Sequence, residues 1–276
     1  MKNKVLTDEQ VAYYREHGYL VLKNWIPADE IARIQEDMDR FIDPPEGHHK
    51  DMVIRDNMLS RITFPLYHAE SFRHTYASPQ ILGLAHDIYD GNFSTFAESI
   101  VVKLPGDAGI DWHQDGNYTP DHTFDRGLNI GIYLQASRIE DGCLFAVPGS
   151  HLEGPADLDA LNEGDFMIDD AIPVEVEAGD VILHSRSLIH GSDLNRSDRK
   201  RITYYMGFHD RLSVDKLFSP EEIEDRMQFI SIAIKDRADS GFYPDEEPFE
   251  SPILPAYHKL DDDAWEALFH GNALGF

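Results

Sequence analysis

The first third of the chain carries apolar residues at helical spacing, interrupted by residues that cap or end helices. Thr7 and Gln10 form a capping box, which predicts a helix that Gly18 would end. A second helix is predicted after Pro27 and a third after Ser78. In the second, the apolar residues recur at intervals of three and four: Ile31, Ile34, Met38 and Phe41. We expect each helix to pack this face against the rest of the protein.

Between Thr95 and His209 the pattern changes to short apolar runs, rich in β-branched and aromatic residues and separated by Gly, Pro, Asp and Asn. Such runs predict strands. They are STFAESIVVKL, LNIGIYLQAS, CLFAVP, IPVEVE, DVILHS and RITYYMGFH. Several short strands with turn signals and no intervening helices favour a sandwich or jelly roll. The expected fold class is therefore mainly β with flanking helices.

No repeat or linker divides the chain, so a single domain is predicted. Ser219 begins a further helix, because it is followed by proline and two glutamates. The segment DSGFYPDEEPFESPILPAY after that helix is too rich in proline for regular structure. The expected parts of the domain 1–276 are a mainly helical N-terminal support (1–94), a jelly-roll core (95–210), and a C-terminal helix and tail (211–276).

Composition and charge narrow the possible functions. Among 276 residues the formal net charge is −27, and such an acidic surface repels nucleic acid and anionic membranes, so neither is an expected partner. The single cysteine, Cys143, excludes an internal disulfide and fits a reducing cytoplasm. No apolar signal segment or membrane span is visible, and a cytoplasmic location is predicted. The oligomeric state is not indicated.

Two His-x-Asp motifs occur, and their context separates them. His49 and Asp51 lie in a loop rich in Pro, Gly and Lys, which we interpret as solvated surface. His113 and Asp115 follow a predicted strand and Trp112. Residues at i and i+2 of an extended segment point to the same side. His113 and Asp115 are therefore candidates for two ligands of one metal ion.

A third ligand is expected from the segment GDVILHSRSLIHGS. His190 is favoured because it precedes a polar turn, and His184, inside the strand, is the alternative. Two histidines and one carboxylate on one face of Fe(II) leave positions free for a co-substrate and O2. Arg201 begins the next strand, and its planar guanidinium suits a carboxylate of such a co-substrate.

These segments resemble the phytanoyl-CoA dioxygenase-like family of iron(II)/2-oxoglutarate-dependent oxygenases. The similarity runs through LTDEQVAYYREHGYLVLKNWIPADEI, VVKLPGD, WHQD, DGCLFAVPGSH, AGDVILHSRSLIHGS and NRSDRKRITYY, and weakens after about Asp210. The resemblance implies a double-stranded β-helix, a type of jelly roll. It also implies an enzyme that couples oxidation of a small organic substrate to release of succinate and CO2 from 2-oxoglutarate.

Individual residues are matched to the family's positions. His113, Asp115 and His190 resemble the iron ligands and catalytic centre, and Arg201 resembles the arginine that holds the distal carboxylate of 2-oxoglutarate. The resemblance gives Arg201 a hydroxyl partner in Ser192. It also suggests that Gln114 and Tyr133 line the co-substrate pocket.

Two alternatives to a 2-oxoglutarate oxygenase remain at this stage. One is a cupin-type metal enzyme, such as an isomerase or an oxygenase that needs no co-substrate, and the other is a non-catalytic jelly-roll binding module. Arg201 favours the oxygenase, because only that enzyme needs a carboxylate clamp near the metal.

The substrate is not identifiable from the sequence. Hydroxylation is the simplest expected outcome, although desaturation, cyclisation and epoxidation share the same chemistry. Pocket residues are expected from loops and the tail, and Asn117, Tyr118 and Phe124 are candidate contacts. The negative charge weakly disfavours a polyanionic substrate such as a coenzyme A thioester. The expected loops are 51–67, 117–126 and 153–172.

Overall fold

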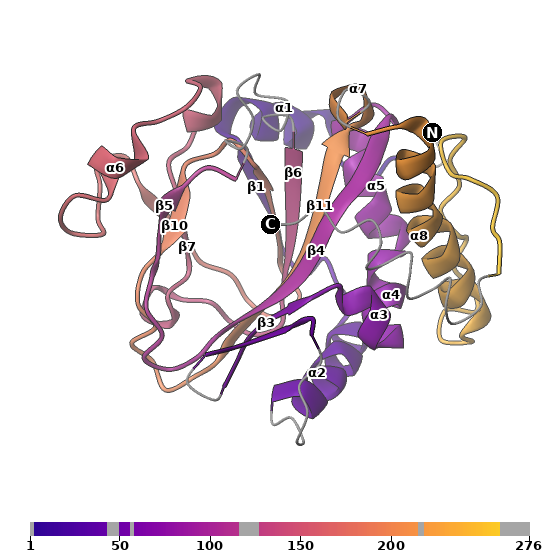
Figure 1. Cartoon of the computed structure of the whole chain (residues 1–276), viewed down its shortest axis with the longest axis horizontal. Coiled ribbons are helices and arrows are strands. Elements are labelled where there is room, and N and C mark those ends of the chain that lie inside the picture. Colours follow the sequence, from indigo (N-terminus) through magenta and orange to yellow (C-terminus); the bar gives the residue numbers. More distant parts are fainter. Residues whose placement is uncertain (1–2, 43–49, 56–57, 116–126, 215–217, 260–276) are drawn as a thin grey trace.

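The computed structural model describes residues 3–42, 50–55, 58–115, 127–214 and 218–259. Its elements form two antiparallel sheets and a layer of helices (Figure 1). The helices are α1 (Asp8–His17), α2 (Ala28–Ile42), α3 (Pro65–His68), α4 (Glu70–Tyr76), α5 (Pro79–Ile88), α6 (Leu158–Leu161), α7 (Arg211–Val214) and α8 (Pro220–Asp239). Short 3₁₀ turns are η2 (Ile139–Asp141) and η3 (Ser150–Leu152).

Eleven strands lie in the described part of the chain. The larger sheet has the order β1-β9-β6-β11-β4-β3-β2, and the smaller one has the order β5-β10-β7-β8. The strands are β1 (Tyr19–Leu22), β2 (Met52–Arg55), β3 (Met58–Thr63), β4 (Phe93–Lys103), β5 (Ile110–His113), β6 (Gly127–Tyr133), β7 (Leu144–Ala146), β8 (Ile172–Val174), β9 (Val181–Ser185), β10 (His190–Ser192) and β11 (Arg201–Asp210). All six predicted runs are strands, and the expected jelly roll is confirmed.

Along the strands of the larger sheet, successive side chains point alternately to its two faces, which differ in character. On β11, Ile202, Tyr204, Met206 and Phe208 are buried in the main core, which lies between this sheet and the helices. Their neighbours Arg201, Tyr205 and Gly207 face the other way and line a cavity. Successive residues of a strand point to opposite sides. One face of the sheet thus makes the core, and the other is available for polar chemistry.

The predicted helices form as their caps indicate. Thr7 closes a capping box with Gln10 at the start of α1, and Gly18 ends that helix in a left-handed conformation. Ser219 caps α8 in the same way through Glu222. Such reciprocal bonds satisfy backbone N–H groups that a helix start leaves without partners. Local sequence therefore determines these boundaries.

The N-terminal third is less purely helical than predicted. It supplies strands β1, β2 and β3 to the larger sheet. The interpretation of Asp51 as solvated surface is wrong: this residue is buried, and its carboxylate lies 3.1 Å from Nε2 of His68. The segment 51–67, expected as a variable loop, contains β2, β3 and α3.

The C-terminal tail follows the helical layer and contains no helix or strand in its described part. Phe249 is buried in the main core, and the guanidinium carbon of Arg237 on α8 lies 3.4 Å from the ring centroid of Tyr243. The tail lies beside α8, away from the smaller sheet (Figure 1). No helix in the described residues has both the length and the apolarity needed to cross a bilayer.

Candidate active site

Two histidines lie side by side on neighbouring strands of the smaller sheet. Strands β5 and β10 pair antiparallel with His113 directly opposite His190, and the two ring centroids are 4.1 Å apart. Nδ1 of His113 lies 2.8 Å from the carbonyl of Asp111, and Nδ1 of His190 lies 2.8 Å from that of Leu188. A carbonyl only accepts, so these bonds place the proton on Nδ1. Each Nε2 is then free to bind a metal.

Asp115 brings a carboxylate to the same point. Its Oδ1 lies 3.6 Å from Nε2 of His113, and its Oδ2 lies 3.6 Å from Nε2 of His190. Among the described residues these three form a group whose candidate ligand atoms all lie within 4.8 Å of one another. Two imidazoles and one carboxylate are a donor set suited to non-haem Fe(II). The arrangement therefore fits an iron ion.

The protonation states also suit metal binding. Burial raises the pKa of the Asp115 carboxyl, but Coulombic interactions, with those of His190 and Arg186 the largest, outweigh burial and hold this pKa below its ordinary value. Burial lowers the pKa of His190 well below 6.5. Carboxylate and neutral imidazole are the forms that bind metals.

His184, the alternative third ligand, lies beside the group but outside it. Its Nε2 is 4.0 Å from Oδ2 of Asp115 and 3.0 Å from Nδ2 of Asn129. The same Asn129 amide donates to Oδ2 of Asp115 at 2.7 Å. Burial lowers the pKa of His184 to about 4, so the ring is neutral. The Asn129 side chain thus contacts both one carboxylate oxygen of Asp115 and the ring of His184.

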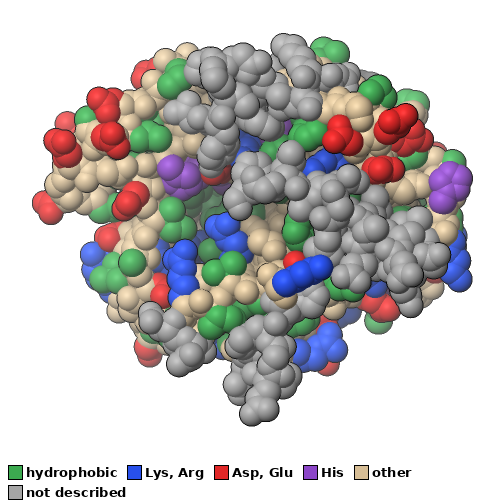
Figure 2. All heavy atoms as spheres, viewed as in Figure 1, with side chains coloured by type: hydrophobic (Ala, Val, Ile, Leu, Met, Phe, Trp, Pro, Cys, Tyr) green, Lys and Arg blue, Asp and Glu red, His purple; other side chains and the backbone are tan. Residues whose placement is uncertain are grey.

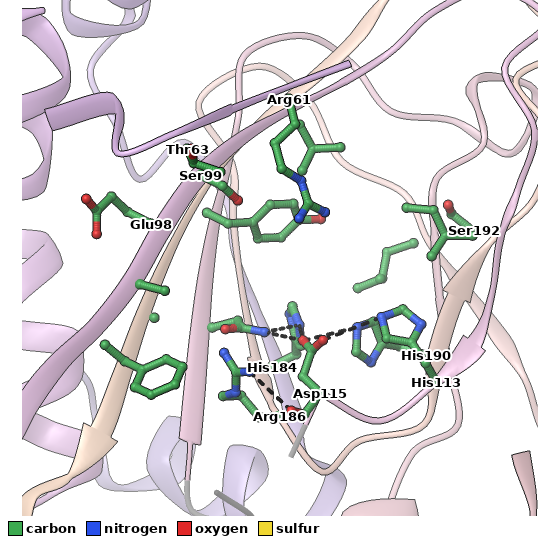
Figure 3. A pocket seen from close by; sticks show the side chains of 18 of the residues that line it. Arg61, Thr63, Glu98, Ser99, His113, Asp115, His184, Arg186, His190 and Ser192 are labelled. Carbon is green, nitrogen blue, oxygen red and sulfur yellow. Dashed lines mark hydrogen bonds and ion pairs between the residues drawn. The ribbon is translucent and has the colours of Figure 1, made fainter. Parts of the chain in front are cut away.

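A cavity of about 500 Å³ opens beside the three candidate ligands (Figure 3). Its wall comes mainly from the cavity face of the larger sheet, including Arg61 and Thr63 on β3 and Ser99 on β4. No residue of 153–172 or of the described tail lines it, so that part of the pocket prediction is wrong. Asn117, Tyr118 and Phe124 lie outside the described residues.

Arg201 enters the cavity from the first position of β11. It is 3% exposed, its Nη1 donates to Oγ1 of Thr203 at 3.2 Å, and its Nε has no partner in the described part of the chain. A buried guanidinium with an unused donor is costly unless an anion arrives. The residue therefore fits a carboxylate of 2-oxoglutarate.

Lys103 is a buried basic residue beside Arg201 and Ser192, outside the residues that line the cavity, and sequence reasoning missed it. It lies directly opposite Arg201 in the β4–β11 pair, and its Nζ donates to Oγ of Ser192 at 2.9 Å and to the carbonyl of Asp193. Burial, and then the charge of Arg201, lower the pKa of Lys103 to about 7. In this structure Ser192 is therefore bonded to the lysine.

Gln114 and Tyr133 lie outside the cavity wall among the described residues. The Gln114 amide donates to the carbonyls of Gly154 and Ser187 and accepts from the backbone N–H of Ala156. Tyr133 is fully buried in a small apolar cluster between the sheets. Their contact with a co-substrate remains a prediction.

The polar wall residues that sequence reasoning missed include Asn129 and Arg186, whereas Arg61 comes from the segment 51–67 that was expected to supply pocket residues. For Arg186 a signal existed, because it stands two residues after His184 and so on the same side of an extended segment. For Lys103 the corresponding signal was its position at the end of the apolar run IVVK.

Known proteins resemble this chain in sequence and in fold. The family model described as phytanoyl-CoA dioxygenase (PhyH) matches residues 14–203. A probable alpha-ketoglutarate-dependent hypophosphite dioxygenase of Stutzerimonas stutzeri is 27% identical over 72% of this chain and 77% of its own length. A methylphosphonate hydroxylase of Gimesia maris is 26% identical, covering 75% of this chain and 82% of its own.

Solved structures agree on the architecture. AviO1 from Streptomyces viridochromogenes Tue57 has a TM-score of 0.60 and 26% identity, with 75% of this chain and 97% of that chain covered. EctD from S. alaskensis with bound Fe has a TM-score of 0.64 at 20% identity, covering 76% and 78%. This second likeness concerns the fold alone.

The comparisons decide between the alternatives that the sequence left. Relatives are named as alpha-ketoglutarate-dependent enzymes, and the family model covers most of the chain. The group of His113, Asp115 and His190 suits the metal that these enzymes use. The chain therefore belongs to the phytanoyl-CoA dioxygenase (PhyH) family and is an Fe(II)/2-oxoglutarate-dependent dioxygenase.

Proposed function

We propose that this enzyme hydroxylates a small organic substrate, with His113, Asp115 and His190 as the iron ligands. The observation that carries the proposal is the approach of two Nε2 atoms and one carboxylate at the wall of a single cavity. When bound, iron and 2-oxoglutarate supply the activation of O2 that oxidises a substrate carbon, with succinate and CO2 as co-products.

Bonds within the protein position the three proposed metal ligands. The carbonyls behind His113 and His190 fix their ring orientation, and Asn129 holds one oxygen of Asp115. Such supporting bonds orient metal ligands and strengthen them as donors.

Arg201 is proposed to bind the distal carboxylate of 2-oxoglutarate. Lys103 lies opposite Arg201 on the neighbouring strand, next to the residues that line the cavity. In the described residues, neither Arg201 nor Lys103 forms an ion pair with an acidic side chain. A dianion bound beside them would therefore gain charge-assisted hydrogen bonds. Ser192, held by Lys103, lines the same cavity.

The ligand assignment is tested by replacing Asp115 with alanine. Succinate release is measured with Fe(II), 2-oxoglutarate and O2, and iron content is measured on the same samples. We expect the variant to lose iron-dependent turnover while circular dichroism remains that of the folded protein. Full succinate production by Asp115→Ala would refute the assignment.

The co-substrate assignment is tested by Arg201→Lys. Lysine keeps the charge but loses the planar fork, so we expect the KM for 2-oxoglutarate to rise by roughly 10-fold or more. Arg15→Lys, on the outside of the molecule, is the matched control. An unchanged KM in Arg201→Lys would remove this arginine from its proposed role.

A further inference from the structure

Arg186 directs a second buried guanidinium into the cavity, beside Asp115 (Figure 3). Its backbone N–H donates to the carbonyl of Gly127 at 3.0 Å, which extends the β9–β6 pairing by one residue. Its side chain therefore lies on the same side of the sheet as His184, two residues earlier. Arg186 is only 8% exposed.

The guanidinium of Arg186 is held in place but is not neutralised. Nη2 donates to the backbone carbonyl of Asp115 at 3.1 Å, and the guanidinium carbon lies 4.9 Å from the ring centroid of Phe96. Its Nε has no hydrogen-bond partner, and no carboxylate lies within ion-pair distance, in the described part of the chain. A buried cation in this condition is expensive unless a ligand supplies the missing charge.

The neighbouring backbone is shaped around this side chain. A Cβ atom at Gly127 would lie 2.2 Å from Cδ of Arg186, closer than atoms can approach. Glycine at the first position of β6 thus leaves the space that the arginine occupies. The position of Arg186 is built by the fold rather than adopted by a free surface side chain.

The cavity wall is rich in basic residues, whereas the chain as a whole is acidic. Among the described residues four arginines line the cavity, against the two acids Glu98 and Asp115, although the chain carries a formal charge of −27. Asp115 would be neutralised by iron and Arg201 by 2-oxoglutarate, and the charge of Arg226 is offset by Glu98. Arg61 is exposed to solvent, which leaves Arg186 as the buried arginine of the wall without an assigned anion. Several Lys and Arg side chains lie around the hollow on the face shown in Figure 2.

We propose that Arg186 binds an oxyanion group, a carboxylate or phosphonate, of the primary substrate. The inference rests on the proposed function and names the substrate class of the same site. The free Nε–H and the remaining guanidinium donors offer the planar edge that such a group accepts. Because Nη2 is bonded to the backbone of Asp115, an anion held here is placed next to the metal ligands.

The test is an anaerobic calorimetric titration of the enzyme loaded with Fe(II) and saturating 2-oxoglutarate. The probes are methylphosphonate and acetate, with dimethyl methylphosphonate and acetamide as uncharged counterparts. We expect the two anions to bind and the neutral compounds not to bind. One charge-assisted hydrogen-bonding group is worth about 1.5–3 kcal/mol, so Arg186→Gln should weaken anion binding by roughly 10- to 100-fold.

Two further variants and three further readouts separate binding from a purely structural role. Arg186→Lys keeps the charge and should restore part of the affinity, whereas Arg15→Gln removes an exterior arginine and should change nothing. Iron content, the KM for 2-oxoglutarate and basal succinate release without primary substrate are also measured on Arg186→Gln, and each variant is titrated with Fe(II) and 2-oxoglutarate at saturation. If Arg186 only positioned Asp115, those three quantities would fall and anion affinity would not be lost selectively.

Several results would overturn the inference. They are absence of binding of both anions to the wild-type enzyme, equal binding of the neutral compounds, or unchanged anion affinity in Arg186→Gln. Basal succinate release by the wild type tests the proposed function separately. If that release is absent, the titration is repeated without iron and 2-oxoglutarate, and an Arg186-dependent anion signal would then support the anion site alone.

Discussion

Replacing Lys103 by methionine should remove a titrating group beside Arg201, the residue proposed to bind 2-oxoglutarate. Lys103 is 3% exposed and lies opposite Arg201, and burial followed by the charge of Arg201 lowers its pKa from 10.5 to about 7. At pH 7 the amine is therefore about half protonated in the protein without ligands. Methionine has similar length and no charge, so it keeps most of the packing.

The magnitude follows from this pKa. A dianion bound beside Lys103 favours the ammonium form and raises its pKa. Binding of 2-oxoglutarate should then draw about half a proton onto the lysine at pH 7, nearly one at pH 8.5, and almost none at pH 6. The apparent affinity for 2-oxoglutarate should accordingly fall as pH rises above about 7.

Calorimetric titration of 2-oxoglutarate in buffers of different ionisation enthalpy measures this proton uptake directly. The wild type is compared with Lys103→Met under anaerobic conditions with Fe(II), and Lys235→Met on the exposed side of α8 is the control. We expect uptake to disappear only in Lys103→Met. Equal proton uptake in the wild type and Lys103→Met at pH 7 and 8.5 would refute the reasoning.

Stability gives an independent check with a defined sign. The folded-state pKa of Lys103 lies below the unfolded value, so the folded protein holds fewer protons between about pH 7 and 10.5. The free energy of unfolding of the wild type should therefore rise with pH in this window relative to Lys103→Met, by at most about 1.4 kcal/mol per pH unit. Urea denaturation without ligands at pH 7 and 9 measures the difference.

Three other changes have defined outcomes. Asn129→Ala removes the donor to Asp115 and should lower the affinity for iron by about 10- to 100-fold. Competition with a chelator measures this affinity, and an unchanged value would contradict the supporting role of Asn129. Arg237→Met leaves Glu30 buried without its partner and should cost about 3–5 kcal/mol of unfolding free energy in urea denaturation. Thr7→Ala removes the cap of α1 and should cost about 1 kcal/mol in the same assay, whereas a loss near zero would show that this helix end frays without effect.

Local sequence alone determined much of the fold. The capping boxes at Thr7 and Ser219 fixed two helix starts, because a cap and its partner are three residues apart. Alternation determined which side chains share a face, so the spacing of His113 and Asp115, together with the strand that precedes them, paired them as candidate ligands. Strands β2 and β3 gave no comparable signal and were missed.

Tertiary structure decided what meets around the cavity. His190 reaches His113 only because β10 pairs with β5 in that register, and Lys103 reaches Ser192 across 89 residues of chain. Such contacts depend on which strands pair, and that choice is made by burial of whole sheet faces rather than by neighbouring residues. The sequence therefore specified the candidate ligands and the clamp arginine, whereas the buried partners Lys103, Asn129 and Arg186 became visible only when the sheets were assembled.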